Sequence, residues 1–311
     1  SRKPSAMTDR GPGWARAPDW LERHWWRVLV SGVALGVIAA LGQAPFGLWP
    51  ATLLGLAASF ALLGAAPSLR RAALVGWSVG LGYFGLTLIW IVQPFLVEPD
   101  RHGWMAPFGL FFMAGGLALF WAAGFAAARW LSPAGRFGWL AFGVGLGILE
   151  YARGVVFTGF PWGGPGLVWI DTAPAHLASL IGAVGLSVLT AWASAGLWIT
   201  LQKRNLRGTV VLIAGFAMAF GGGTWLTLQP VPEREAPVTL RLVQPNAPQH
   251  LKWEPDWVGT FYRRALDLTA EPAQGAQPDL VIWPETSVPT LLGHAPDLQA
   301  EIAATAAPAR V

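Results

Sequence analysis

The sequence predicts an α-helical polytopic membrane domain followed by the start of an α/β domain that the chain does not complete. Hydrophobic residues make up 54% of the 311 residues and charged residues only 12%, with a mean hydropathy of +0.46. Such a composition is typical of membrane proteins. The apolar residues gather in runs close to the ~20 residues that cross a bilayer. After residue 227 the pattern changes to short strand-like and amphipathic stretches.

Residues 1–24 are predicted to form a cytoplasmic N-terminal segment, because they are basic and precede the first apolar run. Ser1 is not a start methionine, so we expect the natural start at Met7 or upstream. A cleaved signal peptide is the alternative. A leader with 24 residues ahead of its apolar run is unusually long, however, and another apolar run follows at once.

Residues 25–227 are predicted to form a membrane domain with about seven transmembrane helices. The candidate spans cover residues 25–42, 48–66, 72–93, 105–131, 136–157, 174–201 and 208–227. Runs such as GVALGVIAALG place small residues three or four apart, which lets helices approach closely in lipid. Nineteen tryptophans against three tyrosines fit aromatic belts at the two bilayer interfaces.

Basic residues between the spans predict the orientation of the membrane domain. Thirteen of them fall in alternate connections: Arg2, Lys3, Arg10, Arg16, Arg23, Arg27, Arg70, Arg71, Arg129, Arg136, Lys203, Arg204 and Arg207. The other connections hold only Arg101 and Arg153. Because cytoplasmic loops carry the excess of Lys and Arg, the N-terminus is predicted to be cytoplasmic and residues after 227 periplasmic.

Two polar features lie at the end of the fifth span. Glu150 and Arg153 are one helical turn apart and are predicted to form an ion pair, with a lipid-headgroup contact as the alternative. The motif FTGFPW (157–162) follows and is interpreted as a shaped loop at the membrane interface.

Residues 228–237 are predicted to be a linker, because proline and charge cluster in QPVPEREAP. Residues 238–311 are then predicted to begin a separate α/β domain. VTLRLVQPN (238–246) alternates like a strand, and residues 256–269 have helical apolar spacing. DLVIW (279–283) is a continuous apolar run and is predicted to be a strand buried on both faces.

Glu285 follows that second strand in VIWPETSVP (281–289). A carboxylate at the end of a buried strand is a usual position for a general base. Another helix is predicted to open after Ala295. Strand, helix and strand at this spacing begin an α/β layer.

Composition also excludes several kinds of site. The absence of cysteine removes disulfides, thiolate metal sites and a thiol nucleophile from these residues, and the five histidines have no metal-ligand spacing. We therefore expect no metal and no cofactor. Residues 1–227 carry 15 Lys/Arg and 7 Asp/Glu, a net +8, whereas residues 228–311 carry 6 and 10, a net −4. The basic residues form no patch for nucleic acid.

Five motifs together resemble the apolipoprotein N-acyltransferase family of bacterial membrane enzymes. They are QAPFGLWP (43–50), GWSVGLGYFGLTLIW (76–90), FTGFPW (157–162), VQPNAPQHLKWEP (243–255) and VIWPETSVP (281–289). They occur in the family's order across nearly the whole chain.

The resemblance implies a nitrilase-like αββα sandwich in the periplasm, attached to a membrane domain in the bacterial inner membrane. It implies transfer of an acyl group from a membrane phospholipid to the N-terminal diacylglyceryl-cysteine of an apolipoprotein, by a monomer that binds no nucleic acid. It also implies a Glu, Lys and Cys triad that works through a thioester, with Glu285 as the general base. Trp253 resembles a tryptophan that the family places near the active site, on the path of the acyl chain or headgroup, with an interfacial or core aromatic as the alternative.

The chain departs from the family pattern after Glu285, where neither lysine nor cysteine follows. Lys252 precedes Glu285, so it is not assigned the catalytic role. We therefore interpret the chain as an N-terminal part that does not catalyse acyl transfer alone.

Two other functions remain as alternatives. A membrane-anchored nitrilase-like amidase would keep the same second domain, but seven spans exceed what an anchor needs. A transporter with an outer cap is disfavoured because the spans carry few ionisable residues, which usually mark transport paths.

Overall fold

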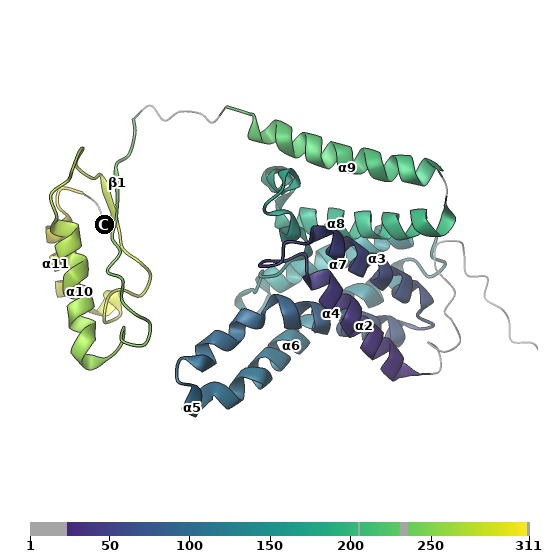
Figure 1. Cartoon of the computed structure of the whole chain (residues 1–311), viewed down its shortest axis with the longest axis horizontal. Coiled ribbons are helices and arrows are strands. Elements are labelled where there is room, and N and C mark those ends of the chain that lie inside the picture. The colour runs from purple at the N-terminus through teal and green to yellow at the C-terminus, as the bar shows by residue number, and fades with distance from the viewer. Residues whose placement is uncertain (1–23, 205, 231–235, 310–311) are drawn as a thin grey trace, which may run out of the picture. The chain divides into compact units, whose positions relative to one another are not determined.

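The computed structural model describes residues 24–204, 206–230 and 236–309. The chain divides into two compact units, Ser1–Gln229 and Pro230–Val311, each with its own core (Figure 1). The predicted N-terminal segment lies outside the described residues except for its last residue, His24. Half of the predicted linker, residues 231–235, lies outside them too.

The first unit consists of apolar helices joined by short 3₁₀ turns, as predicted for a membrane domain. Its main helices are α2 (Trp25–Ala40), α3 (Trp49–Ala65), α4 (Leu69–Thr87), α6 (Ala106–Leu131), α7 (Gly138–Val155), α8 (Ala178–Lys203) and α9 (Leu206–Thr227). Between them lie η1 (Ile89–Leu96), α5 (Pro99–His102), η2 (Gly103–Met105), η3 (Val156–Thr158), η4 (Pro165–Trp169) and η5 (Ala173–Leu177).

Helix length separates these helices into two groups. Among the described residues, four helical stretches are long and apolar enough to cross a membrane: Pro99–Leu131, Gly138–Thr158, Ala173–Lys203 and Leu206–Thr227. The bent pair of α4 and η1 would make a fifth. Helices α2 and α3 are apolar but have only 16 and 17 residues. The count of seven spans therefore stays a prediction, with a helix at each predicted place.

The predicted third span, 72–93, is not one straight helix. Helix α4 ends at Thr87, and η1 continues at an angle of 50° to it. Pro94 lies inside η1 and cannot donate the backbone hydrogen bond that a regular helix needs four residues back. A tighter 3₁₀ segment therefore replaces the last turns of the expected span.

Glycines bring the helices of the first unit close together, as their spacing predicts. Helix α4 packs against both α2 and α6. A Cβ added to Gly36 of α2 would lie 2.0 Å from the carbonyl oxygen of Val79, and one added to Gly76 would lie 2.4 Å from that of Trp121. Only a hydrogen fits at these two crossings. The close approach positions Tyr83 and Trp121, whose rings stack with centroids 4.8 Å apart.

The second unit is a small strand, helix, strand arrangement. Strands β1 (Leu240–Leu242) and β2 (Leu280–Ile282) pair in parallel, and α10 (Pro255–Ala270) makes the crossover between them. The short η6 (Leu292–His294) and then α11 (Pro296–Ala306) follow. The core joins the sheet to both helices through the buried side chains of Val243, Ala265, Val281 and Ala306.

Two predictions about the strands need correction. The first strand covers Leu240–Leu242 and not all of 238–246. The second is not buried on both faces, because Val281 is buried while Ile282 is 42% exposed. Within the described residues the helices cover one face of the sheet, and Leu242 on β1 is also exposed. This small sheet is the described part of the α/β domain, and the nitrilase-like sandwich stays a prediction.

Candidate functional site

Glu285 lies at the carboxyl edge of the parallel strand pair in the second unit. Because β1 and β2 are parallel, the residues that follow each strand meet at the same edge, where α/β proteins usually bind ligands. Strand β2 ends at Ile282, and Trp283, Pro284 and Glu285 follow it. Glu285 is exposed, and it is not among the residues that line the small cavity beside it.

The backbone around this edge adopts conformations that side chains rarely accept. Thr286 has a φ of 57° and Asn246, which follows β1, has a φ of 50°. A β-branched residue in the left-handed region is a genuine outlier. The side-chain hydroxyl of Thr286 donates a hydrogen bond to the Glu285 carbonyl oxygen, which lies 2.7 Å from Oγ1. Strain of this kind clusters at ligand sites.

Lys252 connects the two sequence motifs of the second unit. Its Nζ donates to Thr286 Oγ1 at 2.9 Å and to the carbonyl oxygen of Glu285 at 3.3 Å. The same Nζ lies 5.7 Å from the centroid of the Trp253 ring. Lys252, to which the sequence analysis assigned no catalytic role, thus lies next to both the Trp253 ring and the backbone of Glu285. Lys252 contacts the backbone of Glu285, and no ion pair with its carboxylate is found among the described residues.

Trp253 is 52% exposed and lines a cavity of about 70 Å³. Its lining comes from both loops and from α10: Gln244, Pro245, Ala247, Lys252, Trp253, Val258, Phe261, Pro284, Thr286 and Ser287. Ligand pockets are usually about 300–1,000 Å³. The described residues therefore do not enclose a small molecule by themselves.

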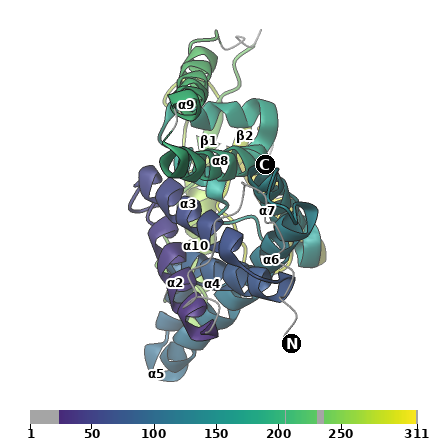
Figure 2. The same ribbon diagram turned by 90° about the vertical axis from the view of Figure 1, so that its right-hand side faces the viewer.

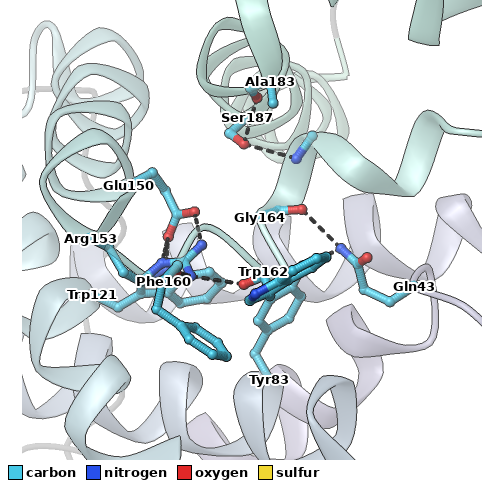
Figure 3. Close-up of polar contacts among 11 residues, drawn as sticks. Gln43, Tyr83, Trp121, Glu150, Arg153, Phe160, Trp162, Gly164, Ala183 and Ser187 are labelled. Carbon is cyan, nitrogen blue, oxygen red and sulfur yellow. Dashed lines mark hydrogen bonds and ion pairs between the residues drawn. The ribbon is translucent and has the colours of Figure 1, made fainter. Parts of the chain in front are cut away.

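A second polar site lies inside the first unit (Figure 3). Arg153 binds Glu150 through two atoms, with Nη2 2.6 Å from Oε2 and Nε 3.2 Å from Oε1. Trp121 Nε1 donates to the same Oε1 at 2.8 Å. The side chains of the pair are 1% and 3% exposed. The predicted ion pair is confirmed, and at this burial it is not accessible to a lipid headgroup.

Arg153 also holds the loop that carries FTGFPW. Its Nη1 donates to the carbonyl oxygens of Phe160 and Trp162, the latter at 2.8 Å. Gly159 has a φ of 84°, and a Cβ there would lie 2.1 Å from the Gly154 carbonyl oxygen. The loop is therefore folded back onto the end of α7, and the guanidinium fixes it from within the unit (Figure 3).

Gln43 extends this network to the end of α2. Its Nε2 donates to Tyr83 Oη at 2.6 Å and to the Gly164 carbonyl oxygen at 3.0 Å. Ser187 of α8 accepts a hydrogen bond from the Gly166 amide at 2.9 Å. We call Gln43, Tyr83, Trp121, Glu150 and Arg153 the membrane polar cluster. The sequence predicted only the Glu150–Arg153 pair, because the other members are separated by 29 residues or more from their partners.

The two sites differ in the chemistry they allow. In the membrane polar cluster both Glu150 oxygens and all three Arg153 nitrogens have hydrogen-bond partners within the unit. At the strand edge the Glu285 carboxylate is exposed to solvent. Among the described residues no group of three His, Cys, Asp or Glu could hold a metal ion.

Comparison with known proteins gives consistent matches in both units. The sequence profile described as "Apolipoprotein N-acyltransferase N-terminal domain" matches residues 35–196, about half of the chain. Proteins named apolipoprotein N-acyltransferase are similar over a longer stretch. That of Caulobacter vibrioides is 38% identical over 277 residues, which cover 86% of this chain and 51% of that protein.

The relatives from Sinorhizobium medicae and Brucella melitensis are 34% and 32% identical over 299 and 295 residues. Both matches cover 89% of this chain, with 56% and 55% of the relatives covered. Coverage of this extent necessarily reaches into the second unit, which begins at Pro230. The chain spans about half the length of the curated relatives it matches.

Proposed function

The chain belongs to the apolipoprotein N-acyltransferase family, and from this premise we propose that it forms the membrane part and the first α/β part of a lipoprotein-acylating enzyme. The enzyme transfers a fatty acyl group from a membrane phospholipid to the α-amino group of the N-terminal diacylglyceryl-cysteine of an apolipoprotein. Both substrates are anchored in lipid, so a catalytic domain joined to membrane helices suits the reaction.

The observation that carries the proposal is the position of Glu285. It lies three residues beyond the end of β2, at the edge where β1 also ends, and its neighbours Lys252 and Trp253 belong to another motif of the same resemblance. In this proposal Glu285 is the general base that activates a cysteine thiol. A free thiol has a pKa of ~8.5, so it needs a base to become a good nucleophile near neutral pH.

The reaction proceeds in two halves. The thiolate attacks the ester carbonyl of the phospholipid, a C–S bond forms, the ester C–O bond breaks, and the proton held by Glu285 passes to the departing alkoxide of the lysophospholipid. The amine of the apolipoprotein then attacks the thioester, which forms the amide C–N bond and releases the thiol. The 311 residues contain no cysteine and the relatives are about twice as long, so the proposal assigns the thiol, and the triad lysine, to residues beyond these.

Trp253 is proposed to contact the lipid substrate. It is half exposed, lines the cavity at the strand edge and presents an aromatic ring beside the ammonium of Lys252. An aromatic ring with one apolar face and one polar neighbour suits the boundary between an acyl chain and a headgroup.

The test of the proposed base is Glu285→Gln in the full-length protein. Glutamine keeps the size of the side chain but cannot take the proton. Formation of the acyl-enzyme should therefore fall by about 100-fold or more. The measurement is covalent labelling of the cysteine by a phospholipid with a tagged acyl chain.

The matched control is Glu271→Gln, which removes another exposed carboxylate from the second unit, at the end of α10. This variant should label at the wild-type rate. Equal labelling of the Glu285 variant and the wild type would show that Glu285 is not the base.

We also propose that the N-terminus is cytoplasmic and that residues after 227 are periplasmic. The thirteen-to-two division of basic residues between the two sets of connections supports this orientation. Reporter fusions after Arg207 and after Pro237 should report opposite compartments. The same compartment for both fusions would contradict an odd number of spans before residue 228.

A further inference from the structure

The first unit contains a cavity of about 560 Å³ between α8 and α9. Figures 1 and 2 show α9 running alongside α8. Its walls are almost entirely apolar and include the indoles of Trp139 and Trp192 and the side chain of Leu212. The volume is within the about 300–1,000 Å³ usual for ligand pockets, and the polarity is that of a site for hydrocarbon.

The second half of α9 packs closely against the rest of the first unit. Phe216 and Phe220 contact the aromatic group around Trp49 and Trp169, with ring centroids 6.2 to 6.4 Å apart. Gly223 is the buried residue of α9, and a Cβ there would lie 2.0 Å from the Ala173 carbonyl oxygen. In the first half of α9, Val211 is 72% exposed.

The two ends of the cavity differ in charge. Among the described residues that line the cavity, the charged one is Arg207, in the first turn of α9. Thr200 of α8 lines the same end of the cavity. Lys203 is the last residue of α8 and Arg204 follows it, and both are exposed. The opposite end is lined by the apolar Pro174 and Leu177. Cations at the mouth of an apolar groove complement a lipid with an anionic headgroup.

We propose that the groove between α8 and α9 binds one acyl chain of an anionic phospholipid from the leaflet at the Lys203–Arg207 end, with Arg207 binding the phosphate. This site is separate from the acyl donor of the proposed reaction, because it opens at the connection predicted to be cytoplasmic. Its lipid fills the space that the packing of α9 leaves open. The inference rests on the proposed orientation of the membrane domain and not on the proposed acyl transfer.

Glycines on both helices leave the room for a chain. Gly215 lines the groove, and a Cβ added there would meet nothing within 4 Å. Gly196 lines it from α8, where a Cβ would touch only Leu212 at 3.6 Å. A bulky side chain at position 215 can therefore occupy the groove without displacing either backbone.

The test uses the full-length protein in phosphatidylcholine vesicles that contain a minor fraction of phosphatidylglycerol with a photoreactive acyl chain. After illumination, peptides from α8 and α9 should carry the label. Unlabelled phosphatidylglycerol should displace it more effectively than added phosphatidylcholine. Gly215→Phe should lower labelling of these peptides several-fold, because the ring fills the groove.

Matched variants separate groove and headgroup effects. Gly221 lies on the same helix, and a Cβ added there also meets nothing within 4 Å, but this residue does not line the groove. The Gly221→Phe variant should therefore be labelled like the wild type. Arg207→Gln should lower the preference for phosphatidylglycerol about fivefold, the factor that corresponds to about 1 kcal/mol per basic residue near an anionic surface. Arg70→Gln removes an exposed arginine from another basic connection and should leave the preference unchanged.

Three outcomes would overturn the proposal. Absence of label from α8 and α9 in the wild type would mean that a protein segment, and not lipid, covers the groove. Equal labelling of the Gly215 and Gly221 variants would place the lipid elsewhere. If phosphatidylcholine displaced the photoreactive lipid as effectively as phosphatidylglycerol does, Arg207 would not be the residue that binds the phosphate.

Discussion

Glu150 in the first unit and Glu285 in the second are carboxylates in opposite environments. The Glu150 side chain is 3% exposed and accepts hydrogen bonds from Arg153 and Trp121 on both of its oxygens. Glu285 is exposed, and the contacts found for it in the described residues are made by its carbonyl oxygen. The Glu150 carboxylate is held in a buried ion pair, whereas the Glu285 side chain is open to solvent.

The comparison teaches how one chain can use the same side chain in two ways. A buried charge is tolerated only when it is paired and hydrogen-bonded, and once paired it is costly to disturb. An exposed carboxylate adds little to stability but can reach a reacting group. A strand end next to left-handed residues holds such a group in place without enclosing it.

The largest expected effect comes from breaking the buried pair. Arg153→Met keeps much of the side-chain volume but leaves the Glu150 carboxylate buried without a cation and the Trp162 carbonyl without a donor. The loss in the free energy of unfolding should be about 3–5 kcal/mol. Thermal and denaturant unfolding of the chain in detergent micelles measures it.

The exposed pair of Arg101 and Glu98, 3.9 Å apart, provides the control. Arg101→Met should cause little change, because exposed ion pairs contribute little. The double variant Glu150→Gln with Arg153→Met should recover part of the loss, since no buried charge remains. If Arg153→Met costs no more than Arg101→Met, the membrane polar cluster is not what holds this part of the unit together.

A smaller effect is expected from the loop that Arg153 holds. Gly159→Ala forces an alanine to a φ of 84° with its Cβ 2.1 Å from the Gly154 carbonyl oxygen. The strain should lower the free energy of unfolding by about 1–3 kcal/mol. Gly116→Ala on α6 is the control, because a Cβ there meets nothing within 4 Å and alanine is the better helix former by about 1 kcal/mol. Equal stability of both variants would mean that the loop relaxes freely.

The smallest effect is expected at Tyr262 in the second unit. Burial, with the hydrogen bond from its hydroxyl to Glu301 Oε2 at 2.8 Å, raises the pKa of Tyr262 to about 12. Its contribution to stability is therefore complete below pH ~10, the pKa in the unfolded chain, and is lost as the pH rises through about 12. An ultraviolet titration of tyrosinate should lose this late ionisation in Tyr262→Phe. If the titration is unchanged, Tyr262 is not the group with the raised pKa.

Sequence patterns predicted the local features of the first unit better than its long-range contacts. Apolar runs locate each helix because hydropathy depends on neighbouring residues. The bend after Thr87 was not predicted from the sequence. Glu150 and Arg153 were paired correctly because they are one turn apart. The contact of Gln43 with Gly164 spans 121 residues and depends on tertiary packing, which no local pattern encodes.

The same division holds for the second unit. The end of an apolar run located Glu285 after a strand, and helical spacing located α10. The bridge from Lys252 to Thr286 was not predicted, because it depends on how two loops meet at the edge of a parallel sheet. The left-handed backbone of Thr286 gave no signal, since threonine is a residue that rarely adopts it.

The shortness of α2 and α3 has a consequence for the surrounding membrane. At ~1.5 Å per residue, helices of 16 and 17 residues extend only about 24–26 Å, less than the ~30 Å hydrocarbon core. Both carry exposed apolar side chains, such as Val30 and Leu54. For helices that span the bilayer, as α2 and α3 are predicted to, such a mismatch costs a fraction of a kcal/mol per Å. We therefore expect the lipid next to these two helices to be thinner than average.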